Sequence, residues 1–116
     1  MTKFTFKKRD GVYYGFRETG HAGFGEEGDD IICAAISAMT MLIINAIEVT
    51  YASDVQYVID EKTTDITVTA KGALKEYESD ERKRFAVSGL IEAYFLQLND
   101  MLEDYSDYID VEEIEE

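Results

Sequence analysis

The chain contains one histidine, His21, and one cysteine, Cys33, and a glycine-containing segment separates them. A thiol becomes a strong nucleophile once it is deprotonated, and an imidazole can take up its proton near neutral pH. His21 and Cys33 are therefore the smallest set of side chains that nucleophilic acyl chemistry requires. Cys33 would attack, and His21 would carry the proton. A single cysteine is usually an inert small hydrophobe, so the pair alone does not establish catalysis.

Asp30 directly precedes an apolar run, and aspartate is a preferred helix N-cap. The pattern predicts that Asp30 caps a helix running from Ile31 to about Ile47. Cys33 would then be the third helical residue, near free backbone N–H groups and the positive end of the helix dipole, which favour a thiolate. The N–H of Cys33 and another at the helix start would bind an oxyanion. Ser37, one turn beyond Cys33 on the same face, is expected to support the site.

The segment 22–29 is predicted to be a loop that closes over a substrate. Glycine has high conformational freedom, which permits such a motion. Phe24 is the one large side chain in this segment, and we expect it to act as a latch on the substrate. The predicted substrate-loop residues are Ala22, Gly23, Phe24, Gly25 and Gly28.

A longer motif surrounds the two reactive residues. Its members in order are Gly20, His21, Ala22, Gly28, Asp30, Ile31, Cys33, Ala34, Ala35 and Ser37. This series resembles the signature of the bacterial ribosomal-processing (Prp-type) cysteine protease family. Weaker likeness extends over nearly the whole chain. Phe24 stands where that family often has Tyr, and Ser106-Asp107 replaces a common Pro-containing turn, but neither departure touches His21 or Cys33.

The resemblance implies a function and a partner. Members of this family remove the short N-terminal extension of a large-subunit ribosomal protein, number twenty-seven, after an aromatic residue. By resemblance the chain is therefore a cysteine endopeptidase and a homodimer. His21 and Cys33 would be catalytic, Gly20, Asp30 and Ser37 supporting, and no metal or cofactor is expected.

Composition narrows the function classes. The chain has 116 residues, which suits one domain spanning 1–116, and its net charge of −14 argues against binding nucleic acid. A basic polypeptide is a better electrostatic partner. One cysteine excludes an internal disulfide, and one Cys with one His cannot fill a tetrahedral zinc site without carboxylates. With no signal peptide recognised and the apolar run judged too short for a bilayer, we expect a cytoplasmic protein without a membrane span.

The first part of the chain is predicted to be a β-hairpin. An alternating run around Phe4 is followed by Asp10-Gly11, a strong two-residue turn signal, and then by a strand over Val12–Thr19. Alternation would put Tyr14 and Phe16 on one face of that strand and Tyr13 on the other. This predicted strand ends two residues before His21.

Two β-rich runs, 55–59 and 66–70, are predicted to form a second hairpin. A second helix is expected over about Asp80–Leu102, whose apolar stripe, beginning at Phe85, suits the core or a dimer surface. A last strand follows over Tyr108–Ile114. The order β-β-α-β-β-α-β indicates an α+β fold with a mainly antiparallel sheet and two helices.

Two other function classes remain open from the residues themselves. The first is a small acidic dimeric protein-binding module, associated with ribosome assembly, in which the thiol is inert. A slow reaction of Cys33 with iodoacetamide would favour it. The second is a thiol-based redox or acyl-transfer enzyme, which would need an external thiol because the chain has no resolving cysteine.

Overall fold

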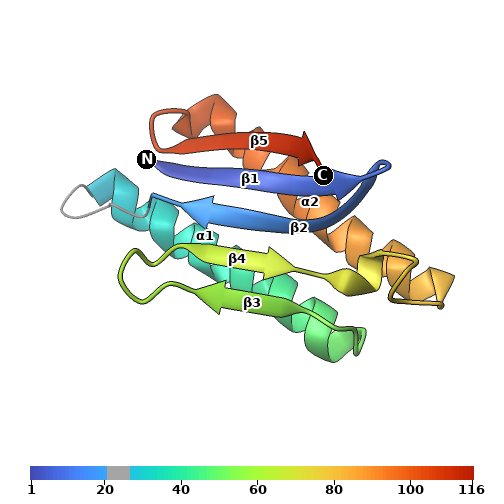
Figure 1. Ribbon diagram of the computed structural model, residues 1–116. Helices are drawn as coiled ribbons and strands as arrows, with labels where there is room; N and C mark the ends of the chain where they lie inside the picture. Colours follow the sequence, from blue (N-terminus) through green and yellow to red (C-terminus); the bar gives the residue numbers. More distant parts are fainter. Residues whose placement is uncertain (21–26) are drawn as a thin grey trace.

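The computed structural model describes residues 1–20 and 27–116. For residues 27–30 it describes the backbone only. Within these residues, a five-stranded sheet is covered on one face by two helices (Figure 1). In chain order the strands and helices are β1 (Thr2–Arg9), β2 (Val12–Thr19), α1 (Glu27–Asn45), β3 (Gln56–Ile59), β4 (Ile66–Thr69), α2 (Glu81–Tyr105) and β5 (Ile109–Glu115). This order confirms the predicted α+β fold.

The strands lie in the order β3-β4-β2-β1-β5, and every neighbouring pair is antiparallel except β1 and β5, which are parallel. It follows that β2 runs in the same direction as β3, and β4 in the same direction as β5. Parallel strands need a crossover connection, which α1 supplies for the first pair and α2 for the second. Both crossovers lie on the same side of the sheet (Figure 1), so both helices cover one apolar face.

The predicted turn between β1 and β2 is confirmed. Asp10 and Gly11 have φ angles of 52° and 80°. Two successive positive φ angles are what a two-residue hairpin turn requires, because they match the twist of the flanking strands. The second predicted hairpin is also present, with Tyr57 of β3 paired with Val68 of β4.

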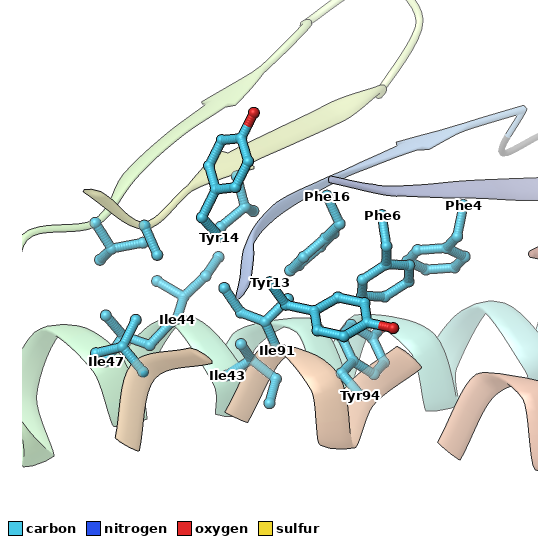
Figure 2. Packing of buried hydrophobic residues seen from close by; sticks show 14 of the residues in the cluster. Phe4, Phe6, Tyr13, Tyr14, Phe16, Ile43, Ile44, Ile47, Ile91 and Tyr94 are labelled. Atoms are coloured by element: carbon cyan, nitrogen blue, oxygen red, sulfur yellow. The ribbon is translucent and has the colours of Figure 1, made fainter. Parts of the chain in front are cut away.

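Aromatic rings form the centre of the core. Phe4 and Phe6 of β1 and Phe16 of β2 are fully buried. The ring of Tyr94, on α2, meets these three rings edge-on, with centroid separations of 5.6, 5.9 and 5.4 Å respectively. Figure 2 shows the three phenylalanine rings pointing from the sheet toward the helices. Burial of such rings, with their edge-to-face contacts, is a large apolar contribution to stability.

A bulge in β2 corrects the predicted faces of its tyrosines. Lys7 pairs with Gly15 and Lys8 with Tyr13, so Tyr14 is an extra residue in the ladder. Because one extra residue reverses the alternation beyond it, Tyr13 lies on the helix side, 5.5 Å from the ring of Phe95 on α2. Tyr14 points the other way (Figure 2), so the prediction that Tyr14 shares a face with Phe16 was wrong.

Helix α1 is longer than predicted at its start. It begins at Glu27 instead of Ile31, and it ends at Asn45, where a π-helical turn, Ala46–Thr50, continues it. By length and composition alone, the stretch Ile31–Thr50 could cross a membrane, contrary to the sequence estimate. The core helix of a soluble protein passes the same test, and buried residues of α1 such as Ile36 contribute to the core here.

Helix α2 begins as predicted, with Asp80 as its N-cap. The Asp80 carboxylate accepts a hydrogen bond of 2.9 Å from the backbone N–H of Arg82, which satisfies one of the free donors of the first turn. The helix extends to Tyr105, beyond the predicted end at Leu102. Phe85 was expected in the apolar stripe but is 82 % exposed, because the buried side of α2 begins two residues later, at Val87. The buried residues of α2 are Val87, Ile91, Tyr94 and Leu98.

Candidate active site

Cys33 lies on α1 with its thiol half-buried and free of any disulfide. Its neighbours along the helix, Ile32 and Ile36, are buried in the core beneath the sheet. Ser37 follows one turn later and is exposed. The thiol therefore stands at the border between the core and the surface, where a side chain is held by packing and can still meet a substrate.

The predicted cap at Asp30 was wrong. Because α1 begins at Glu27, Asp30 is a helical residue and Cys33 is the seventh residue of the helix. The N–H groups without an intrahelical acceptor belong to the first turn, whereas the N–H of Cys33 falls in the second. Cys33 is thus further from the positive helix end than expected, and its own N–H is not one of the free oxyanion donors.

Gly28 was expected in the substrate loop, but this prediction was wrong. The backbone of Gly28 lies inside α1, which begins at Glu27.

Five predicted site residues lie outside the described residues. They are His21, Ala22, Gly23, Phe24 and Gly25. Their roles as general base and substrate loop stay predictions.

Gly20 directly follows the last residue of β2, Thr19, and precedes His21 in the sequence. It has a φ angle of 81°, a left-handed conformation that residues with a side chain rarely adopt. A Cβ at this position would also collide with the carbonyl oxygen of Met1. Both the positive φ angle and the close contact with Met1 require glycine here, which gives a physical reason for the first residue of the motif.

Sequence analysis missed Glu18, a carboxyl group on the inner face of β2. Glu18 is only 1 % exposed. It pairs with Phe4 of β1 on one side and Ile66 of β4 on the other. Burial, with a smaller contribution from the Asp65 charge, raises the pKa of Glu18 to about 7. Alternation offered a signal, because Glu18 lies two residues after the buried Phe16 and must share its face.

A buried hydrogen-bond network joins α2 to the part of α1 that follows Cys33. The hydroxyl of Tyr94 lies 2.7 Å from the Thr40 hydroxyl and donates to the carbonyl oxygen of Ile36, 3.2 Å away. Burial raises the pKa of Tyr94, and the nearby Glu18 charge acts in the same direction. This network fixes the position of this part of α1, one turn beyond Cys33, relative to α2.

Two hollows among the described residues have walls that do not include Cys33. One, of about 290 Å³, lies beside the β1–β2 turn, where Arg9 and Arg84 contribute to its wall. Another is an apolar groove between α1 and α2, lined in part by Leu42 and Ala93. Over residues 1–20 and 27–116, no three His, Cys, Asp or Glu residues are grouped so that they could hold a metal ion.

Solved structures match this fold closely. A crystal structure of SMU.848 from Streptococcus mutans has a TM-score of 0.80 and 30 % sequence identity, covering 100 % of this chain and 99 % of that one. The essential ribosomal processing protease Prp from S. aureus, in complex with a substrate peptide, has a TM-score of 0.79 and 19 % identity, covering 98 % and 100 %. The same protease with a covalently linked product peptide has a TM-score of 0.76 and 20 % identity, with the same coverage.

A comparison with curated proteins gives no match. The family described as cysteine protease Prp, in contrast, matches residues 1–110, which include His21, Cys33 and all of the motif around them. The molecule is thus a hydrolase whose nucleophile is a cysteine, and the sequence-based identification is confirmed. The chain belongs to the Prp family of cysteine proteases.

Proposed function

We propose that the chain is an endopeptidase that uses a Cys33–His21 dyad to remove the N-terminal extension of a large-subunit ribosomal protein, number twenty-seven, after an aromatic residue. The position of Cys33 carries this proposal. The only cysteine of a cysteine protease must be its nucleophile, and here it is half-buried on a core helix.

The reaction follows the chemistry of a thiol nucleophile. His21 takes the thiol proton, and the sulfur of Cys33 attacks the carbonyl carbon of the scissile peptide bond. His21 then gives that proton to the leaving amine, and a thioester of the N-terminal extension remains on Cys33. Water, deprotonated by His21, hydrolyses the thioester and restores the thiol. His21 is the single imidazole in the chain, so it is the natural proton carrier for both steps.

The proposed substrate rests on the family and on one relative. The S. aureus protease is described as a ribosomal processing protease and has been crystallised with a substrate peptide and with a covalently linked product peptide. A peptide in covalent linkage is what a nucleophilic mechanism produces. These relatives favour a ribosomal protein precursor as the substrate of this chain as well.

Charge supports a basic partner. The net charge of −14 attracts basic polypeptides and repels nucleic acid, so a ribosomal protein precursor should be captured faster at low ionic strength. We also propose that the enzyme is a cytoplasmic homodimer, since a cytoplasmic thiol stays reduced. The apolar groove between α1 and α2, which includes the exposed Leu42, offers one surface for a second copy.

The decisive experiment uses the extended ribosomal protein from the same organism. It is incubated with the enzyme, and the new N-terminus is mapped by mass spectrometry. We expect the wild type to make one cut after an aromatic residue and Cys33→Ala to make none. Cys33→Ser should be almost inactive, because a hydroxyl needs a stronger base than one imidazole. Cleavage by Cys33→Ala at the wild-type rate, or an intact precursor with a folded wild-type enzyme, would contradict the proposal.

A further inference from the structure

We propose that Tyr57 and Ile59 of β3 form the surface on which an extended apolar segment of the polypeptide substrate rests while Cys33 reacts. We call these two side chains the β3 surface. The inference rests on the proposed function, because it names how the substrate of that function is held. Four features support it: the side of α1 that carries Cys33, the face of β3 on which the surface lies, its exposure and its lack of charge.

Cys33 lies on the side of α1 that is turned away from α2. A helix turns by about 100° per residue, so Ser37 and Met41, four and eight residues later, lie on the same side as Cys33. Met39 lies about 120° around the helix from Cys33 and lines the groove with Tyr94 of α2. Because α2 packs on β2 and β5, the side of α1 that carries Cys33 is the side of β4 and β3.

The pairing of the strands places the β3 surface on the inner face of the sheet. Tyr57 pairs with Val68 of β4, and Val68 pairs with Phe16 of β2, whose ring lies in the core. Paired residues point to the same face of a sheet, so Tyr57 points to the side on which the helices lie. Ile59, two residues later, shares this face, whereas Val58 between them points to the outer face.

The helix layer covers the inner face only as far as β4. Val68 is fully buried, whereas Tyr57 and Ile59, one strand further out, are 43 % and 50 % exposed. Figure 1 shows α1 passing behind β4 toward the start of β3, and Figure 2 shows the β3–β4 hairpin above α1. The β3 surface is therefore an exposed apolar surface beside α1.

The direction of β3 brings this surface to the correct end of the sheet. Ile59 is the last residue of β3, which runs in the same direction as β2. Ile59 therefore lies at the end of the sheet where β2 ends and near which α1 begins (Figure 1). Cys33 is in the second turn of α1, so the β3 surface and the nucleophile lie toward the same end of the molecule.

Both sides of this region lack charge. Neither 31–47, most of α1, nor 55–59, which includes β3, contains a charged residue, although 31 % of the residues in the chain are charged. The strand at the opposite edge of the sheet, β5, has four acidic residues among its seven. Edge strands are usually protected by such charges, and an exposed apolar surface without them is typical of a binding site.

The charges that flank β3 favour a peptide substrate over a second copy of the chain. Asp54 precedes the strand, and Asp60, Glu61 and Lys62 follow it, which gives three carboxylates against one ammonium group. Two copies joined at this surface would bring these carboxylates together, in addition to the repulsion between two chains of net charge −14. An apolar segment of a basic precursor meets no such repulsion.

The kinetic consequence follows from when these contacts form. The apolar side chains of the substrate leave water on binding and stay on the β3 surface while the thiol attacks, so the contacts stabilise the bound substrate and the transition state alike. Loss of such contacts raises KM and leaves kcat nearly unchanged. Loss of the nucleophile or of the proton carrier would lower kcat instead.

The first measurement is the kinetics of precursor cleavage by Tyr57→Ala, Ile59→Ala and the double variant. Val58→Ala is the matched control, because it shortens a side chain of the same strand on the opposite face. We expect KM to rise at least about tenfold in the double variant with kcat within about twofold of the wild type, and each single variant to lie between them. Val58→Ala should leave both constants unchanged.

The second measurement needs no ribosomal protein. Iodoacetamide alkylates Cys33, the only thiol, and a bound peptide slows this reaction. The probe is an uncharged tetrapeptide, Val-Leu-Val-Phe, blocked at both ends, and its polar counterpart is Ser-Gly-Ser-Gly. We expect the apolar peptide to protect the wild type and Val58→Ala, and the double variant to need at least about tenfold more peptide for half-protection. Equal rates of alkylation without peptide show that the fold and the thiol are unchanged.

The outcomes separate this inference from the proposed function. Equal protection of the wild type and the folded double variant, no protection of the wild type, or an equal loss in Val58→Ala would overturn the role of the β3 surface. A dimer that becomes a monomer in the double variant during sedimentation, with protection unchanged, would assign the surface to a second copy and also overturn it. Failure of the wild type to cleave the ribosomal precursor, with protection as expected, would overturn the proposed function alone.

Discussion

The inner face of the sheet is built in two contrasting ways along its length. Below α2 it carries an aromatic cluster, which we define as Phe4, Phe6, Phe16, Tyr94 and Phe95, with each ring in contact with at least one other. Near the start of α1 lies the site end, which we define as Glu18, Gly20 and Cys33. There the same layers hold a buried carboxyl group, a left-handed glycine and a half-buried thiol.

The contrast separates stability from chemistry. Each ring of the aromatic cluster buries apolar surface at no electrostatic cost, so this region contributes to folding. Each feature of the site end is neutral or unfavourable for folding, since burial penalises a charge and a left-handed turn gains nothing from side-chain packing. A small domain can keep such a site because the aromatic cluster lies directly beside it.

The largest expected effect on activity is that of Cys33→Ala. We expect cleavage of the ribosomal protein precursor to fall to the uncatalysed level, because no other thiol can replace the nucleophile. Stability should change little, since only a half-buried sulfur is removed. The measurement combines the precursor assay with thermal melting, and a large drop in melting temperature would mean that Cys33 belongs to the core.

Phe6→Ala, in contrast, should strongly lower the stability of the fold. Phe6 is fully buried among four other rings, and truncation of such a residue costs about 3–5 kcal/mol in the free energy of unfolding. Urea denaturation measures the loss. Tyr57→Ala on the exposed face of β3 is the control, with an expected change within about 0.5 kcal/mol. Equal effects of the two variants would contradict the central place of the aromatic cluster.

The free energy of unfolding should depend on pH through Glu18. Its pKa is raised from the usual 4.5 to about 7, so the folded state binds more protons than the unfolded state between these values. The free energy of unfolding should therefore be highest below about pH 4.5 with respect to this group and should decrease as the pH rises to 7, by roughly 3 kcal/mol in total. Denaturation curves at several pH values check this. Glu18→Gln should remove the slope, and an identical slope in the variant would refute it.

The smallest expected effect compares the starts of the two helices. Asp80→Ala removes the hydrogen bond to the N–H of Arg82 and should cost about 1 kcal/mol. Asp30→Ala removes no N-cap, because Asp30 is inside α1, and should cost less. Melting of both variants is the measurement. A larger loss in Asp30→Ala than in Asp80→Ala would restore the cap at Asp30.

Local patterns in the sequence were sufficient for most of the elements. Asp10-Gly11 predicted the first hairpin, because only a few residue types tolerate two positive φ angles in succession. Asp80 followed by an apolar stripe predicted the start of α2. The motif around Cys33 resembles the signature of the protease family, and the match to that family confirms the resemblance. In each case the information lies within a few neighbouring residues.

Only the tertiary structure decided the features that depend on distant parts of the chain. The parallel pairing of β5 with β1 and the bulge at Tyr14 arise from contacts between strands. The start of α1 at Glu27, three residues before the predicted cap, was likewise found only in the structure. The sequence by itself determined which residues can react, because reactivity depends on chemical type. Which of them come together depends on how the sheet and the helices pack, and packing is set by the whole chain.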